Sequence, residues 1–113
     1  ILNGDIQEDE DISLMIGDKD LVLESAKKAA LMAISNSKNA KIEFAIMFSD
    51  ISRLLLLRKD AYKEIDAVKK IIGKNIPILG CYTLGEYAPF NAEESKGQCH
   101  FNNQSISIAL FSE

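Results

Sequence analysis

The sequence lacks the features of a secreted or membrane protein: it has two cysteines, no tryptophan and no long apolar run. Cys81 and Cys99 are too few for a secreted disulfide framework, so we expect a reducing compartment. A bridge between them stays open, because sequence alone does not give the Cα separation that a disulfide needs. No apolar run approaches the roughly 20 residues of a membrane helix, and we expect no membrane contact.

The charged residues form no basic cluster longer than a pair. The 113 residues include 13 Lys and Arg and 17 Asp and Glu, which gives a net charge of −4. Scattered basic residues argue against a nucleic-acid partner, whose recognition needs Lys and Arg gathered on one face. With 47% hydrophobic residues, a chain of this length predicts one compact domain.

The amino-terminal stretch is acidic and precedes any regular pattern. Five of the seven residues 5–11 are Asp or Glu, and such a charge run is usually solvated. The chain begins with Ile1 and not with Met. We interpret residues 1–11 as an acidic lead-in or the end of a linker, and residues 12–113 as a domain that is a fragment of a larger protein.

Apolar periodicity predicts strands and helices in alternation. Residues 12–16 predict a short strand, and residues 20–37 predict a helix that begins at Asp20 as its N-cap. The apolar stripe of that helix is rich in alanine, which predicts close packing against a sheet. Residues 42–49 predict a central strand, and their nearly continuous apolar run indicates that both faces are covered.

The second half of the chain completes the sheet. Residues 60–72 predict a helix that stops at Gly73, and strands are expected after Pro77 and over residues 105–111. Two helical crossovers predict parallel neighbours, whereas the last strand should be antiparallel. The sequence therefore predicts an α/β or α+β two-layer domain, with a mixed sheet of at least four strands and two main helices.

Polar groups gather in two blocks that flank a long loop. Residues 80–86 contain two glycines, where a backbone can approach a ligand closely, followed by Glu86. Residues 99–104 bring His100 and Asn102. If the strands next to these blocks pair, Glu86, His100 and Asn102 converge at one end of the sheet. No Gly-Lys-Ser/Thr pattern is present, so a phosphate-binding P-loop is not predicted.

A third polar block, residues 50–53, follows the central strand, where ligands collect in open α/β sheets. Arg53 is suited to clamp a ligand carboxylate, and it is equally suited to an ion pair with Asp50, Asp60 or Glu64. Glu64 is offset from the apolar stripe of its helix, which predicts a solvent position.

Metal binding and catalysis are not indicated. Cys81, Cys99, His100 and Glu86 offer donor atoms, but only Cys99 and His100 are close in sequence, and neighbours on a strand point to opposite faces. A cysteine nucleophile would have no orienting third group and no oxyanion hole. We expect no metal, no cofactor and no catalysis by this fragment.

Taken together, the blocks resemble the FIST C domain, the carboxy-terminal half of the FIST sensory module. The likeness rests on the strand and turn ending in Arg53, a later Glu64, the Gly-x-Tyr-Thr-x-Gly-Glu sequence of residues 80–86, and the His and Asn block of residues 99–105. Asp50 stands where that family usually has Cys. The resemblance covers roughly the last two-thirds of the chain.

The resemblance implies a cytoplasmic sensory domain of a multidomain signal transduction protein, with an amino-terminal FIST half and an output domain as partners in the same chain. Its ligand would be an amino acid or a similar small polar molecule. The residues that we expect to bind it are Asp50, Arg53, Cys81, Thr83, Gly85, Glu86, His100 and Asn102. Ordering of the loop at residues 87–98 would pass the signal on. The alternative is an interaction or oligomerisation module, a homodimer for example, assembled through the four leucines of residues 54–57.

Overall fold

The computed structural model describes residues 7–11, 16–89 and 98–113. Its helices and strands follow one another as α1 (Lys19–Asn36), β1 (Ile42–Asp50), α2 (Ile51–Leu57), the 3₁₀ turn η1 (Arg58–Asp60), α3 (Tyr62–Ile72), β2 (Ile78–Thr83), β3 (Glu86–Ala88), β4 (His100–Asn102) and β5 (Ile106–Ser112). Apart from Ile16, the strand predicted at residues 12–16 lies outside the described residues, and so does most of the loop at residues 87–98.

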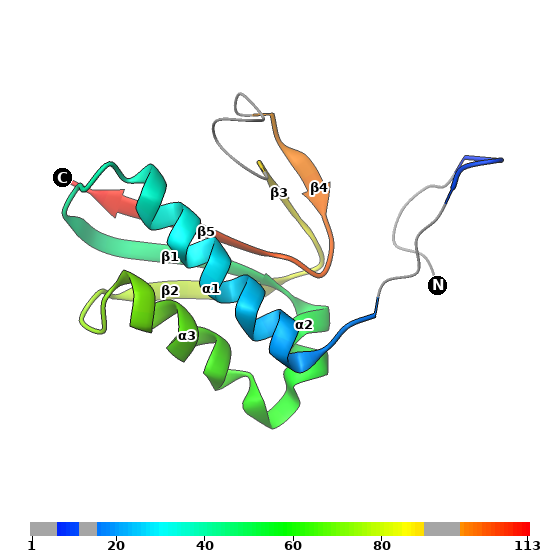
Figure 1. Cartoon of the computed structure of the whole chain (residues 1–113), viewed down its shortest axis with the longest axis horizontal. Coiled ribbons are helices and arrows are strands. Elements are labelled where there is room, and N and C mark those ends of the chain that lie inside the picture. Colours follow the sequence, from blue (N-terminus) through cyan, green and yellow to red (C-terminus); the bar gives the residue numbers. More distant parts are fainter. Residues whose placement is uncertain (1–6, 12–15, 90–97) are drawn as a thin grey trace.

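The strands form one mixed sheet and one small antiparallel sheet. In the first, the order is β2-β1-β5, with β2 parallel and β5 antiparallel to β1. Strands β3 and β4 pair only with each other among the described strands and stand apart from the larger sheet (Figure 1). The predicted two-layer fold with a mixed sheet is confirmed, but the mixed sheet has three described strands and not the predicted four or more, because β3 and β4 form a sheet of their own. The strands next to the two polar blocks do not pair, however, because β1 lies between β2 and β5.

Local chemistry explains where the helices begin and end. The N-cap of α1 is Asp18 and not the predicted Asp20: its extended backbone lets the carboxylate accept the N–H groups of Asp20 and Leu21, at 2.8 and 3.2 Å. Helix α3 ends at Gly73, whose φ of 122° suits glycine. Both helices therefore lie within about two residues of their predicted bounds.

The core lies between the helices and one face of the larger sheet. Helices α1 and α3 pack against each other on the same side of that sheet (Figure 1). The buried cluster consists of Ala26 and Ala30 from α1, Ala45 and Met47 from β1, and Val68 and Ile72 from α3. The small alanines let α1 approach the sheet closely, as its sequence predicted.

The opposite face of the sheet is not covered within the described ranges. Phe44 and Phe48 of β1 alternate with the buried Ala45 and Met47 and stay partly exposed, and Phe44 stacks on Phe111 of β5 with ring centroids 4.3 Å apart. The prediction that β1 is covered on both faces is therefore wrong for these residues. An apolar strand reveals that its side chains avoid water, but not whether a second layer is present.

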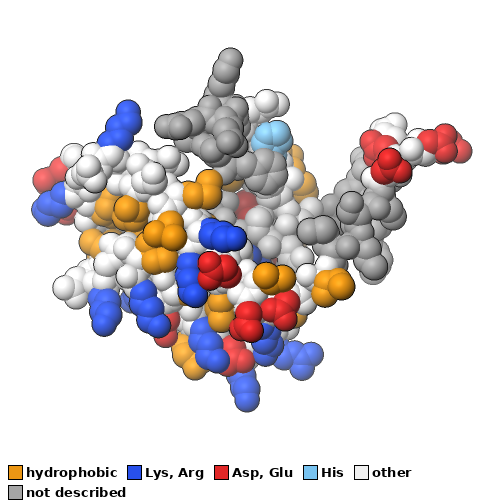
Figure 2. All heavy atoms as spheres, in the orientation of Figure 1, with side chains coloured by type: hydrophobic (Ala, Val, Ile, Leu, Met, Phe, Trp, Pro, Cys, Tyr) orange, Lys and Arg blue, Asp and Glu red, His pale blue; other side chains and the backbone are white. Residues whose placement is uncertain are grey.

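The four leucines of residues 54–57 do not form a continuous exposed patch. Leu57 is fully buried, Leu55 is 67% exposed, and the other two are partly buried because α2 turns them in different directions. The helical side of the molecule instead displays basic and acidic side chains interspersed over α1 and α3 (Figure 2). None of the helices in the described ranges is long and apolar enough to cross a membrane.

Candidate functional site

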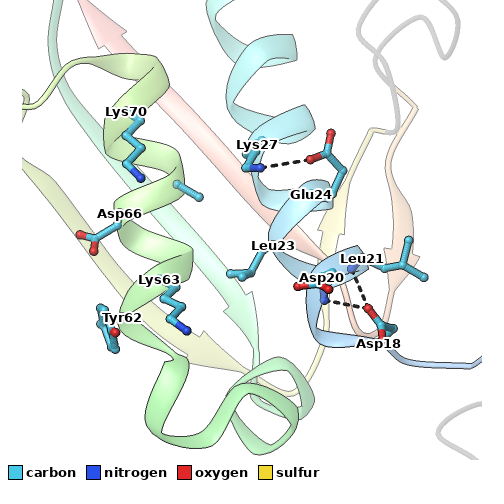
Figure 3. A pocket seen from close by; sticks show the side chains of 11 residues that line it. Asp18, Asp20, Leu21, Leu23, Glu24, Lys27, Tyr62, Lys63, Asp66 and Lys70 are labelled. Atoms are coloured by element: carbon cyan, nitrogen blue, oxygen red, sulfur yellow. Dashed lines mark hydrogen bonds and ion pairs between the residues drawn. The ribbon is translucent and has the colours of Figure 1, made fainter.

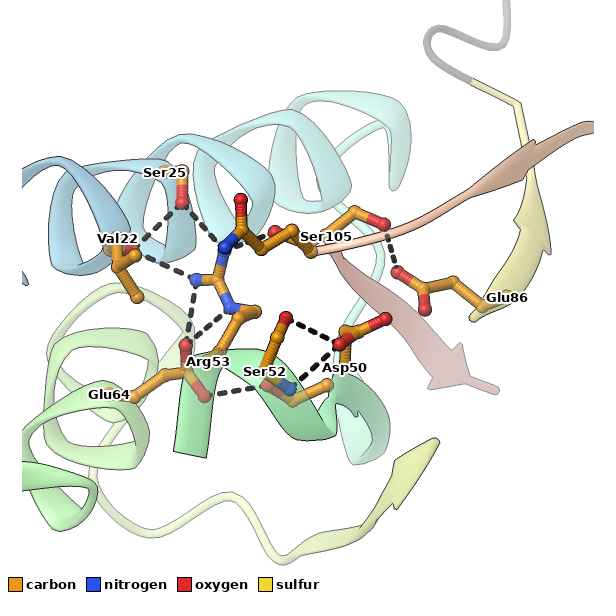
Figure 4. A network of polar contacts seen from close by, with 10 residues as sticks. Val22, Ser25, Asp50, Ser52, Arg53, Glu64, Glu86 and Ser105 are labelled. Carbon is orange, nitrogen blue, oxygen red and sulfur yellow. Dashed lines mark hydrogen bonds and ion pairs between the residues drawn. The ribbon is translucent and has the colours of Figure 1, made fainter. Parts of the chain in front are cut away.

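A buried ion pair lies where β1 ends and α2 begins. Arg53 of α2 is 2% exposed and Glu64 of α3 is 1% exposed. The Nε and Nη2 atoms of Arg53 lie 2.8 and 2.7 Å from Oε1 of Glu64 (Figure 4). The predicted solvent position of Glu64 is therefore wrong. A buried guanidinium needs an ionised partner, and Glu64 is the carboxylate that faces it.

The remaining contacts of Arg53 and Glu64 tie four parts of the fold together. Nη1 of Arg53 donates to Oγ of Ser25 at 3.0 Å and to the carbonyl of Gln104 at 3.3 Å. Nη2 donates to the carbonyl of Val22 at 2.9 Å, and the Ser49 hydroxyl donates to Glu64 at 2.9 Å. Arg53 thus connects α1, α3 and the turn before β5 (Figure 4). Its N–H groups are directed at acceptors of the protein itself.

Asp50 caps α2 beside this pair. Its carboxylate accepts the backbone N–H of Ser52 at 2.8 Å and the Ser52 hydroxyl. Burial alone would raise the pKa of the Asp50 carboxyl, but the hydrogen bonds from Ser52 and from the Gln104 backbone, together with the Arg53 charge, lower the pKa below its ordinary value. Asp50 therefore stays ionised although it is only 5% exposed.

Glu86 is the third buried carboxylate at this end of the sheet, with 8% exposure. It accepts hydrogen bonds from the hydroxyls of Ser105 and of Thr83, the latter at 3.3 Å. No Lys or Arg side chain of the described residues pairs with it. Gly85 before it has a φ of 126°, and a Cβ there would lie 2.6 Å from the Phe101 ring. Only glycine fits this close approach of β3 to β4.

The β3–β4 sheet places Asn102 opposite Glu86 and His100 opposite Ala88. Nδ2 of Asn102 donates to the carbonyls of Ala88 and His100, at 3.3 and 3.0 Å. His100 itself is exposed. Cys81 is exposed next to Phe48 on the uncovered sheet face, and no disulfide joins it to Cys99.

The structure thus gathers six of the eight predicted ligand residues around one end of the sheet. Asp50 pairs in register with Thr83, and Asp50 donates its backbone N–H to the carbonyl of Ser105, which also contacts Glu86. His100 and Cys81 are the two remaining predicted residues, and both are exposed. The gathered residues are Asp50, Arg53, Thr83, Gly85, Glu86 and Asn102.

A groove of about 450 Å³ opens beside this polar centre, between α1, β5 and the β3–β4 sheet. We call it the α1–β5 groove. Arg53 and Asn102 are the predicted residues that line it, and Ser25, Lys28 and Gln104 are residues that sequence reasoning missed. Its other lining residues are Ala29, Met32, Ala33, Asn36, Ala88, Pro89 and Ser105 to Ile108. Gln104 and Ser105 belong to a block already singled out, whereas nothing local marks Ser25 or Lys28 on α1.

A second hollow, of about 780 Å³, lies between α1 and α3 and is called here the α1–α3 groove (Figure 3). Charges of both signs line it: Lys27, Lys63 and Lys70 face Asp20 and Asp66 around an apolar floor that includes Leu23. In Figure 3, Lys27 turns along α1 to pair with Glu24.

In the part of the chain that the structure describes, no three His, Cys, Asp or Glu side chains gather in a way that could hold a metal ion. A family model described as the FIST C domain matches residues 1–89. The searches of curated proteins and of solved structures gave no match.

Proposed function

The chain belongs to the FIST C domain family, which comprises sensory domains of signal transduction proteins, and we propose that it senses a small polar molecule such as an amino acid. The sensing domain acts in the cytoplasm, beside an amino-terminal FIST half and an output domain of the same protein. Its role is to bind and not to catalyse.

The observation that carries this proposal is the charge of the α1–β5 groove. Its volume of about 450 Å³ is of the size of small-molecule sites, roughly 300–1,000 Å³. Lys28 and Arg53 are the charged residues that line it, and no carboxylate of the described residues does so. Because Glu64 pairs with Arg53, the exposed Lys28 is the charge that the groove offers to a ligand, and it favours a ligand that carries a carboxylate.

The hydrogen bonds and ion pairs of the lining residues indicate different roles for Arg53 and Lys28. Because the N–H groups of Arg53 are bound by Ser25, Glu64 and main-chain carbonyls, Arg53 holds the groove in shape, and Glu64 balances its charge. Lys28 is exposed and has no ion pair among the described residues, so its ammonium is available for a ligand carboxylate. These roles replace the direct clamp by Arg53 that the sequence suggested.

Ser105 supplies a hydrogen-bond acceptor for the ammonium group of an amino acid. Its hydroxyl donates to Glu86, which leaves the lone pairs of Oγ as acceptors on the groove side. Glu86, one hydrogen bond behind, makes that oxygen more negative and thereby strengthens its attraction for a ligand ammonium group. Glu86 and Thr83 act through Ser105 and do not touch the ligand.

Calorimetry with a panel of amino acids tests the proposal on the intact chain. Lys28→Gln should weaken binding by about tenfold to a hundredfold, because a hydrogen bond to a charged group contributes about 1.5–3 kcal/mol. Lys27→Gln is the matched control, since Lys27 is the neighbouring lysine of α1 and lines the other groove. The proposal fails if no amino acid binds, or if both variants bind as the wild type does.

Assembly is the second candidate function, because the uncovered sheet face is apolar. Phe44, Phe48, Leu79 and Phe111 are exposed there, and an uncharged face of this kind could meet a second copy without like-charge repulsion. Light scattering over a range of concentrations separates the two candidates. A dimer that Phe48→Glu dissociates would support assembly, whereas a dimer lost on Leu55→Glu would point to α2.

A further inference from the structure

The outer edge of β5 faces the α1–β5 groove with unpaired backbone groups. Asp50 donates its N–H to the carbonyl of Ser105 at 3.1 Å, which places these two residues at a hydrogen-bonded position of the ladder. The register continues through Phe48 opposite Ser107. Because such pairs alternate in an antiparallel ladder, the N–H and C=O groups of Ile106, Ile108 and Leu110 point away from β1. No described strand pairs with that edge.

The groove follows this edge. Three consecutive residues of β5, Ile106, Ser107 and Ile108, line it, although their side chains alternate between the two faces of the sheet. The lining therefore includes the main chain of the edge itself. Helix α1 forms the opposite wall with Ala29 and Ala33, whose small side chains leave room between the helix and the strand. A groove between a helix and a free strand edge suits an extended chain, which can add to the sheet as a further strand.

The charges of the groove lie toward one end. Arg53 contacts both Ser25 of α1 and the carbonyl of Gln104, which fixes these residues at the same level of the groove. Lys28 lies one helical turn further, and Asn36 is at the far end of the lining on α1. The distance along α1 from Ser25 to Asn36 is roughly 16 Å at 1.5 Å per residue, the length of about five residues of extended chain.

We propose that the α1–β5 groove binds a short extended peptide as an added strand on β5, with a carboxylate of the peptide beside Lys28. This inference rests on the proposed function, since it names the ligand class of the same groove. The outward N–H and C=O groups of Ile106 and Ile108 bind the main chain of the peptide. Alternate peptide side chains pack toward Ala29 and Ala33, so small apolar residues are favoured there.

A single amino acid can use only part of this surface. It can reach Lys28 with its carboxylate, but it has too few main-chain groups to pair with both Ile106 and Ile108. A peptide of three to five residues does both, which gives it an advantage that grows with each ladder hydrogen bond. Main-chain recognition also makes the groove tolerant of sequence, as in other cases of strand addition.

The first test uses calorimetry with the tetrapeptide Ala-Val-Ala-Val and its N-methylated forms. One form carries methyl groups on the first and third peptide nitrogens and the other carries one on the second, so that each removes N–H groups on one side of the extended chain. An added strand predicts that one form loses at least tenfold in affinity and the other retains most of it. Equal affinity, or equal loss, for the two forms overturns the inference. A carboxy-terminal amide should weaken binding in the wild type and not in Lys28→Gln.

The second test removes the ladder donor from the protein. Ile108→Pro deletes an outward N–H inside the groove, and Leu110→Pro deletes one on the same edge outside the lining; edge strands tolerate proline at such positions. We expect at least tenfold weaker peptide binding for the first variant and unchanged binding for the second. Circular dichroism shows whether each variant folds, and if Ile108→Pro does not, the methylated peptides decide the matter.

The outcomes separate this inference from the proposed function. If free amino acids bind with the expected Lys28 dependence and the tetrapeptide does not bind, only the added strand is refuted. If the tetrapeptide binds and no free amino acid does, the amino-acid ligand of the proposed function is refuted and the added strand stands. If neither amino acids nor peptides bind, both fail.

Discussion

The two grooves beside α1 differ in how their charges are held. Arg53 lines the α1–β5 groove, and behind it Glu64 completes a buried ion pair with further hydrogen bonds on both partners. The α1–α3 groove is lined by exposed charges, among which Lys27 and Glu24 pair at 3.3 Å with about half of each side chain exposed. Water and salt screen the second set far more strongly than the first. The α1–β5 groove is thus preformed, whereas the charges of the α1–α3 groove can rearrange.

This difference bears on function because a sensor needs a site whose geometry is set before the ligand arrives. Arg53 links α1, α3 and the turn before β5, so its buried hydrogen bonds and ion pair hold the walls of the α1–β5 groove together. The α1–α3 groove is larger, but its opposite charges compensate one another. Size alone would favour the α1–α3 groove, whereas the arrangement of charge favours the smaller α1–β5 groove.

The largest effect should follow from breaking the buried pair. Arg53→Met leaves the Glu64 carboxylate buried without its partner, and we expect a loss of about 3–5 kcal/mol in the free energy of unfolding, measured with urea. Replacing both residues, Arg53→Met with Glu64→Leu, should cost less than the single change, since no charge is then left unpaired. A single-variant loss below about 1 kcal/mol would mean that the pair does not hold the groove together.

A smaller loss is expected at Gly85, in the turn that leads from β2 into β3; the β3–β4 sheet forms one wall of the α1–β5 groove. Gly85→Ala puts a Cβ 2.6 Å from the Phe101 ring at a φ of 126°, and we expect about 1–3 kcal/mol of destabilisation. Thermal unfolding followed by circular dichroism measures it. Gly17→Ala is the control, because its Cβ would meet Leu56 at an ordinary 3.4 Å without a positive φ. Equal effects of the two changes would show that the turn is not restricted to glycine.

Acid should weaken the same region through Asp50. Its folded-state pKa is lowered, mainly because the Ser52 and Gln104 hydrogen bonds and the Arg53 charge outweigh the effect of burial. The stability that this carboxylate contributes is fully present above its unfolded pKa, near 3.9, and is lost as pH falls through the folded value. Asp50→Asn should therefore lose less stability below about pH 4 than the wild type, while asparagine keeps the cap at neutral pH. Identical acid unfolding curves for the two proteins would contradict the assignment.

The sequence was informative where structure depends on neighbours in the chain. The stripe of α3 and its stop at Gly73, and the mixed sheet with helical crossovers, follow from local patterns. The burial of Glu64 could not be found in this way, because it depends on Arg53 reaching across from another helix. Lys28 and Ser25 were missed for a similar reason: which side of α1 faces β5 is decided by tertiary packing.

The open face of the sheet also shows what local sequence patterns do not predict, namely the number of layers. Phe44 and Phe48 have the apolar character of core residues, and the run of residues 42–49 suggested two covered faces. The packed helices distinguish the two faces of β1. Ala45 and Met47 face the helices and are buried, whereas Phe44 and Phe48 alternate with them on the uncovered face. Periodicity identifies the strand, and the number of layers is set by elements distant in sequence.

The smallest effect should come from the exposed charges of the α1–α3 groove, which is the sharpest check of the comparison. Glu24→Gln removes the partner of Lys27, three residues away on α1, and we expect about 0.2–0.5 kcal/mol of destabilisation at low salt. That loss should vanish near 1 M NaCl, where the screening length is about 3 Å, whereas the loss from Arg53→Met should persist because water and ions do not reach its site. Urea unfolding of both variants at low and high salt measures this contrast. If salt reduced both losses to the same extent, the two grooves would not differ in how their charges are held, and the preference for the α1–β5 groove as a preformed binding site would lose its physical basis.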